Sequence, residues 1–192
     1  MNILTSRRVL LTLLVVGIAG SVAGFGTYSA FTATSTNTGN AFASGSVAIS
    51  DNDSNGSMLA LSNAKPGDSS TGCIKATYTG TLAASVRLYG TITGTLAQYL
   101  TLTVTRGTNT SAFSSCANFS ADATDYIGSG AGVVYNGNLS AFPATWTAGV
   151  VDPTSWSQND AHAYKFVVTL QDNNSAQGLT STAGFTWEAR NN

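Results

Sequence analysis

Short β-branched or alternating runs, each bounded by turn residues, constrain the fold of this chain more than any other feature. Such runs, rich in Val, Ile, Thr and aromatic residues, are typical of β-strands. Turn signals between them include Asn55-Gly56, Lys65-Pro66-Gly67-Asp68 and Asp172-Asn173-Asn174. The expected strands are residues 42–50, 57–62, 73–80, 84–93, 99–107, 131–137, 141–149, 163–172 and 184–190.

About nine short strands at this spacing, with almost no helical period, predict an all-β fold. We expect an antiparallel β-sandwich of jelly-roll type over residues 41–192, which is long enough to bury one core. Residues 108–130 form the longest irregular insertion. No alternation of strands with helices favours a parallel α/β sheet.

The N-terminal segment has the pattern of a secretory signal peptide. Arg7 and Arg8 precede an apolar run over residues 9–24, which is at the short limit for a membrane span. Small residues favour cleavage between Ser29 and Ala30, so residues 1–29 form the expected signal peptide, and cleavage after Ala30 is the near alternative. A permanent N-terminal anchor is the other interpretation. With cleavage, the chain contacts the membrane only as a precursor.

The charge of the mature chain argues against nucleic-acid binding. From Ala30 onward there are six Lys and Arg against nine Asp and Glu, which gives a net charge of −3. Charged residues make up only 9% of the chain, whereas 43% hydrophobic residues favour a packed core over disorder. A surface this poor in charge resembles that of secreted adhesive and fibrous proteins and is prone to associate.

Two cysteines, Cys73 and Cys116, suit a single disulfide in an exported domain. This bond would tie the 108–130 insertion to the strand that carries Cys73. A pair of buried free thiols is the alternative interpretation.

No catalytic motif is present in the sequence, and we predict neither catalytic residues nor a cofactor. There is no G-x-S-x-G, no H-E-x-x-H and no phosphate-binding glycine loop. His162, the only histidine, is expected to be an ordinary polar residue at the start of a strand, and with two cysteines it provides too few zinc ligands. Glu188 has no visible second carboxylate for acid–base chemistry.

One local pattern resembles the opening of a calcium-binding loop. Asp51, Asp53 and Asn55 stand at its alternate positions and Gly56 follows them. Position 12, however, is Ser62 where a bidentate Glu is required, and neither flank is helical. A polar turn around Asn55-Gly56 explains the same residues, so the calcium site is a weak candidate.

Residues 30–40, which follow the predicted cleavage point, have the pattern of an exposed β-strand without charge. In an extended chain Phe31 and Ala33 share one face, while the threonines lie on the other. Such a peptide suits a donor strand that adds to the sheet of a neighbouring subunit. A first strand of its own sandwich and an unstructured terminus are the alternatives. The predicted polymerisation strand consists of Ala30, Phe31, Thr32, Ala33, Thr34, Ser35 and Thr36.

Four segments resemble signatures of the TasA/camelysin family: GTYSAF (26–31), FASGSVAIS (42–50), LSNAKPGD (61–68) and FTWEAR (185–190). The resemblance covers both ends and the first hairpins. It implies a secreted jelly-roll subunit of extracellular or biofilm matrix fibres, processed by a SipW-type signal peptidase and assembled by insertion of the mature N-terminus into the next subunit. Thr32-Ala33-Thr34, where the family often has charges, and the two cysteines depart from its pattern.

The sequence therefore predicts a secreted, non-enzymatic structural subunit in an extracellular matrix or at a cell surface. Its main expected partner is itself, in a head-to-tail homopolymer, and a fibre-nucleating accessory protein is a further candidate. One alternative is a secreted metallo-endopeptidase, as camelysin is described. The other is a monomeric accessory or anchoring surface protein.

Overall fold

A computed structural model describes residues 44–110 and 112–191, and it is all-β over those residues. Nine strands and three short 3-10 helices are found there. The strands are β1 (Ile49–Asp51), β2 (Ser69–Tyr78), β3 (Ala84–Thr93), β4 (Leu100–Thr108), β5 (Ser120–Ala121), β6 (Val133–Asn138), β7 (Val150–Val151), β8 (Ala161–Leu170) and β9 (Thr182–Asn191). The helices are η1 (Thr95–Tyr99), η2 (Leu139–Ala141) and η3 (Asn174–Ala176).

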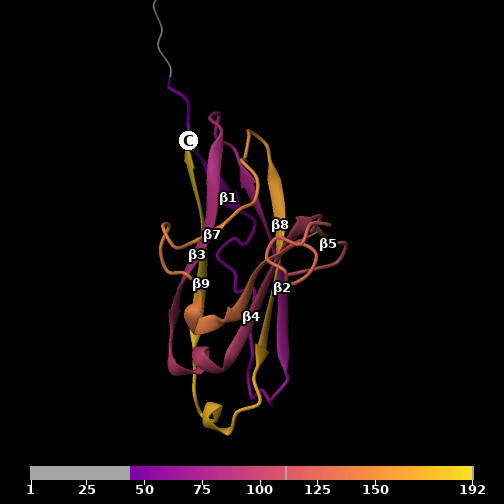
Figure 1. Ribbon diagram of the computed structural model, residues 1–192, viewed down its shortest axis with the longest axis vertical. Coiled ribbons are helices and arrows are strands. Elements are labelled where there is room, and N and C mark those ends of the chain that lie inside the picture. The colour runs from indigo at the N-terminus through magenta and orange to yellow at the C-terminus, as the bar shows by residue number, and fades with distance from the viewer. Residues whose placement is uncertain (1–43, 111, 192) are drawn as a thin grey trace, which may run out of the picture. The chain divides into compact units, whose positions relative to one another are not determined.

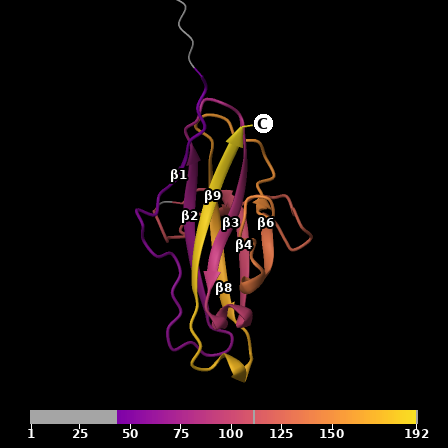
Figure 2. The same cartoon turned by 90° about the vertical axis from the view of Figure 1, so that its left-hand side faces the viewer.

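The strands form two antiparallel sheets, which confirms the predicted β-sandwich. One sheet has the order β1-β2-β8-β4-β5, with β6 also paired to β4, and the other has the order β7-β3-β9. Figures 1 and 2 show the long strands of both sheets running side by side. The chain changes sheet five times: on entering and leaving β3, on entering and leaving β7, and again between β8 and β9. Such repeated crossing between sheets is the kind of path that a jelly roll takes.

The core lies between the sheets and follows the two-residue period of the strands. In β3 the buried residues Ala84, Val86 and Leu88 alternate with partly exposed neighbours. In β8 the ring of Phe166, which is fully buried, packs 5.9 Å from the ring of Trp187 in β9. Each large apolar side chain buried in this way stabilises the fold by about 1.5–3 kcal/mol.

Two predicted strands are not strands in the structure. Residues 57–62 are irregular, because their apolar side chains pack against the core without pairing with a neighbouring strand. Ala141 ends η2, and residues 142–149 are irregular: Phe142 is their only buried large apolar side chain, and Pro143 has no N–H to give to a ladder. Of the predicted strand 42–50, the part described from residue 44 onward is extended only at its end, in β1.

Two short strands, β5 and β7, were not predicted. β5 pairs with Gly107 and Thr108 at the end of β4. A Cβ atom at Gly107 would lie 2.0 Å from the carbonyl oxygen of Ser120, so only glycine allows this approach. The total of nine strands therefore agrees with the prediction, although the individual strands differ.

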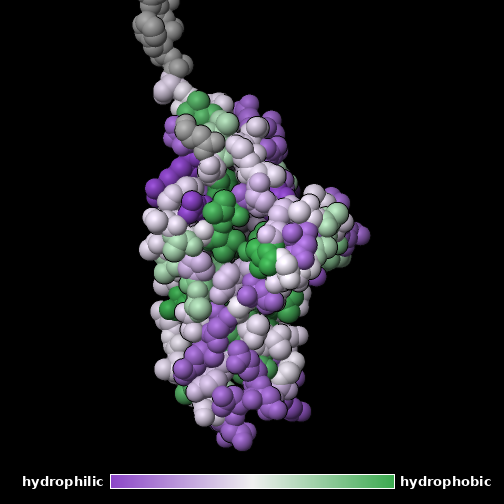
Figure 3. All heavy atoms as spheres, in the orientation of Figure 1, coloured by the Kyte–Doolittle hydropathy of each residue, from purple (hydrophilic) through white to green (hydrophobic). Residues whose placement is uncertain are grey.

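The surface of the described residues is unevenly polar. On the face in Figure 3, hydrophilic residues gather at the end that carries η3, and hydrophobic residues are exposed near the middle. None of the helices in the described part of the chain is long and apolar enough to span a bilayer. The predicted signal peptide, residues 1–29, lies outside the described residues.

Candidate functional site

An open groove runs along the side of the sandwich, between edge strand β9 of one sheet and edge strand β1 of the other. Its volume is about 410 Å³. Figure 2 looks at this side: β9 (yellow) faces the viewer, and β1 with the irregular chain that follows it (purple) lies alongside. Residues 57–61 form much of the wall opposite β9.

The groove is lined mainly by apolar side chains and has the length of a short strand. Asp51 pairs with Ala76 near one end, and Ser70 lies six residues further along β2. At about 3.3 Å per residue this is a span of about 20 Å, enough for about six extended residues. The main apolar side chains along it are Met58, Leu61, Ile74, Val168, Phe185 and Trp187.

The edge of β9 beside the groove is unpaired within the described residues. β9 pairs along its whole length with β3 and with no other strand there. Every second residue of such an edge turns its N–H and C=O groups away from the sheet, where another chain can pair with them. Residues 182–187 contain no charged residue that would block pairing. The groove thus combines an open strand edge with an apolar floor.

The predicted cleavage residues Ser29 and Ala30, and the predicted polymerisation strand from Ala30 to Thr36, lie outside the described residues. The described chain joins the sandwich at the turn between β2 and β3. There the Ser46 carbonyl accepts hydrogen bonds from the N–H groups of Thr81 and Leu82, at 2.8 and 3.2 Å. We call this end of the sandwich the attachment end.

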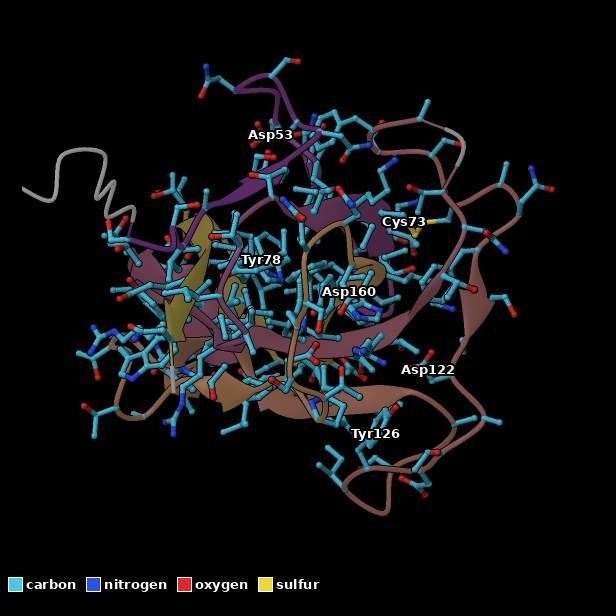
Figure 4. All side chains as sticks on the ribbon, turned by 90° about the horizontal axis from the view of Figure 1, so that it is seen from above. Asp53, Cys73, Tyr78, Asp122, Tyr126 and Asp160 are labelled. Carbon is cyan, nitrogen blue, oxygen red and sulfur yellow. A yellow bond between two sulfur atoms is a disulfide. The ribbon has the colours of Figure 1, made fainter. Side chains whose placement is uncertain are left out.

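Cys73 and Cys116 form the predicted disulfide, with their Cα atoms 5.1 Å apart. A disulfide of this kind is typical of an oxidising compartment. Beside it the Ser114 N–H donates to the Cys73 carbonyl at 2.9 Å, so the loop is held to β2 by its backbone as well. Figure 4 shows the sulfur bond at Cys73, with the turn that carries Asp53 nearby. Phe113 of this loop lines the groove, which makes the disulfide loop part of its wall.

Asp51 and Asp53, the weak calcium candidates, stabilise a turn. The Asp53 N–H donates to Asp51 Oδ1 at 3.1 Å, and the Asn55 N–H donates to Asp53 Oδ1 at 2.8 Å. Burial and the neighbouring Asp53 raise the pKa of Asp51. These are the hydrogen bonds of the polar turn that the sequence allowed as the alternative. Both aspartates lie at the end of the groove nearer the attachment end.

A buried polar cluster centred on Arg106 lies apart from the groove and was missed by the sequence analysis. Arg106 is 4% exposed, and its Nε donates to Asp152 Oδ2 at 2.9 Å. Its Nη1 donates to Asp122, and the hydroxyl of Tyr126 donates to the same carboxylate at 2.9 Å. In Figure 4 Asp122 and Tyr126 lie on the loops between β4 and β6. The cluster thus fastens two connecting segments to β4.

The signal that would have revealed this cluster is strand alternation. Leu100, Leu102 and Val104 of β4 point into the core, and the same period places Arg106 on the inward face. His162 precedes Tyr164 and Phe166 on the inward face of β8 in the same way, and it is half-buried where we expected an ordinary edge residue. Burial, and then the guanidinium of Arg106, lower the pKa of His162.

No protein-family model matches the chain, and no curated protein matches it.

Proposed function

We propose that this chain is a secreted structural subunit that polymerises head to tail into extracellular or biofilm matrix fibres. The mature N-terminus, residues 30–40, would enter the groove beside β9 of a neighbouring subunit and add a strand to its smaller sheet. The observation that carries the proposal is the edge of β9, which is unpaired within the described residues and free of charge over residues 182–187, beside a mainly apolar groove. Main-chain hydrogen bonds would supply affinity, and Phe31 would fill part of the apolar floor.

The dimensions and chemistry of donor and groove agree. The predicted polymerisation strand has seven residues, Ala30 to Thr36, and the groove spans about six extended residues. The strand presents Phe31, Ala33 and Ser35 on one face, which suits an apolar floor. A contact between two different surfaces of the same subunit does not close on itself and produces an open filament.

The described residues favour this function over a metallo-endopeptidase. Among them, no group of three or more His, Cys, Asp and Glu side chains lies close enough together to hold a metal ion. His162 Nε2 faces the Arg106 guanidinium at 2.9 Å, a cation that would repel a metal at this nitrogen.

Electron microscopy of two purified chains tests the proposal. One chain begins at Ala30 and the other at Ala41, so that they differ only in residues 30–40. We expect filaments from the longer chain alone, with circular dichroism showing the same β-structure in both. Monomers from both chains would favour a monomeric accessory or anchoring protein, and filaments from both would exclude residues 30–40 as the connector.

A further inference from the structure

We infer that the incoming strand lies antiparallel to β9, with its N-terminus at the Asp51 end of the groove. The inference rests on the proposed function and adds the direction of the donor strand, which in turn fixes how successive subunits stack. Three features of the described residues carry it: the direction of β9, the place where the chain joins the sandwich, and the charges that line the groove.

β9 runs toward the attachment end. Its first residue, Thr182, pairs with Thr93 at the far end, and Asn191 pairs with Ala84 beside the turn between β2 and β3. Ser46 is fixed at that same turn. A segment that ran through the groove and continued directly into Ser46 of its own chain would therefore be parallel to β9. All the strand pairs in the described residues are antiparallel.

An antiparallel strand from the same chain cannot reach back to its own attachment point. Its C-terminal end, Thr36, would lie near Ser70, and the path along β2 from Ser70 to Tyr78 is about 26 Å. Nine residues separate Thr36 from Ser46, and a reversal at each end uses at least two of them. The remaining five span only about 17 Å. Antiparallel insertion therefore requires a second copy of the chain.

In a second copy the same direction needs no reversal. An antiparallel donor leaves the groove at the far end, beside Leu96 and Ser181, and continues straight into the attachment end of its own sandwich. Successive subunits would then stack end to end, with the attachment end of each facing the far end of the one before.

The charges agree with this direction. Asp51 and Asp53 are the only charged side chains among the described residues that line the groove, and both lie near its attachment end. Cleavage before Ala30 would create an α-ammonium group, the only positive charge within residues 30–50. The antiparallel direction brings this ammonium to the two carboxylates, whereas the parallel direction places it at the uncharged far end.

Four double-cysteine variants of the chain that begins at Ala30 test the direction. Thr32 and Thr36 lie on the donor face opposite Phe31, and Thr182 and Thr186 are exposed on the face of β9 opposite Trp187. Antiparallel addition brings together Thr36→Cys with Thr182→Cys, and Thr32→Cys with Thr186→Cys. Parallel addition brings together Thr32→Cys with Thr182→Cys, and Thr36→Cys with Thr186→Cys. Residues directly opposite in a sheet are close enough for a disulfide.

We expect covalent ladders on non-reducing gels from the first two variants only. Ladders from the other two alone would overturn the antiparallel direction and leave polymerisation intact. Filaments without ladders from any variant would show that the donor does not lie along β9. A chain beginning at Ala30, without added cysteines, that forms no filaments would overturn the proposed function itself, and the direction with it.

Discussion

His162 Nε2 lies 2.9 Å from Arg106 Nη2, so the imidazole accepts a hydrogen bond from a buried guanidinium. A guanidinium only donates, and the accepting nitrogen must therefore be unprotonated. The His162 ring also packs edge-on against Trp156, with ring centroids 4.6 Å apart. Burial, and then the positive charge of Arg106, lower the pKa of His162 below the ordinary value of 6.5, so the folded state favours the neutral imidazole.

Acidification should weaken the fold through His162. Because its pKa is lower in the folded state, the unfolded chain binds more protons as the pH falls below 6.5, and stability falls until the folded-state pKa is passed. Urea unfolding between pH 7.5 and pH 5 should show this loss, and His162→Gln should flatten it. His162 is the only histidine, so equal slopes in both proteins would contradict the assignment.

Removal of the buried Arg106 guanidinium should lower the free energy of unfolding far more than removal of a guanidinium at the surface. Arg106→Ala leaves Asp152 buried without its partner, and we expect a loss of about 3–5 kcal/mol in the free energy of unfolding. Arg190→Ala is the matched control, because its ion pair with Glu188 is exposed and should contribute about 1 kcal/mol or less. Urea titration of both variants measures the difference, and similar losses would contradict the role of the cluster.

The disulfide should stabilise the sandwich strongly. Replacement of Cys73 and Cys116 by serine opens a loop of 43 residues, and the entropy of the unfolded chain predicts a loss of about 4 kcal/mol. The midpoint of urea unfolding should fall, and dithiothreitol should produce the same shift in the unaltered protein. A double variant as stable as the parent would contradict this.

Donor and acceptor defects should complement each other. Phe31→Asp places a charge on the donor face, and Ala183→Asp places one in the groove, beside Phe185. Neither variant should form filaments alone, since each lacks one half of the contact. An equimolar mixture should form heterodimers, measured by size-exclusion chromatography with light scattering.

Thr91→Asp is the control for these variants, because its exposed side chain lies on β3 and is not among the residues that line the groove. It should still form filaments. Filaments from Ala183→Asp alone would contradict the acceptor role of the groove, and filaments from Phe31→Asp alone would contradict the donor role of residue 31.

Local sequence predicted the fold better than it predicted the strand limits. β3 has the predicted bounds, because alternation and turn residues agree there. Residues 57–62 form an apolar run of similar character, yet the neighbour that would make them a strand is not present in the described sandwich. Whether an apolar run becomes a strand depends on what lies beside it, which local pattern does not contain.

The site was harder to predict than the fold. The disulfide could be predicted from composition, because two cysteines have only one possible pairing. The groove depends on which strands end the two sheets, and that order is set by pairings between residues far apart in the sequence, such as Ala84 with Asn191. The Arg106 cluster likewise joins residues from three distant segments.

The bond between Cys73 and Cys116 also bears on when the groove is complete. It holds the loop whose Phe113 forms part of the groove wall, so a subunit that still carries two thiols would present a looser acceptor. Thiols stay reduced in the cytosol and oxidise after export. Under the proposed function, the bond would form only after export, and self-association inside the cell would be weak until the subunit reaches the place where a fibre is built.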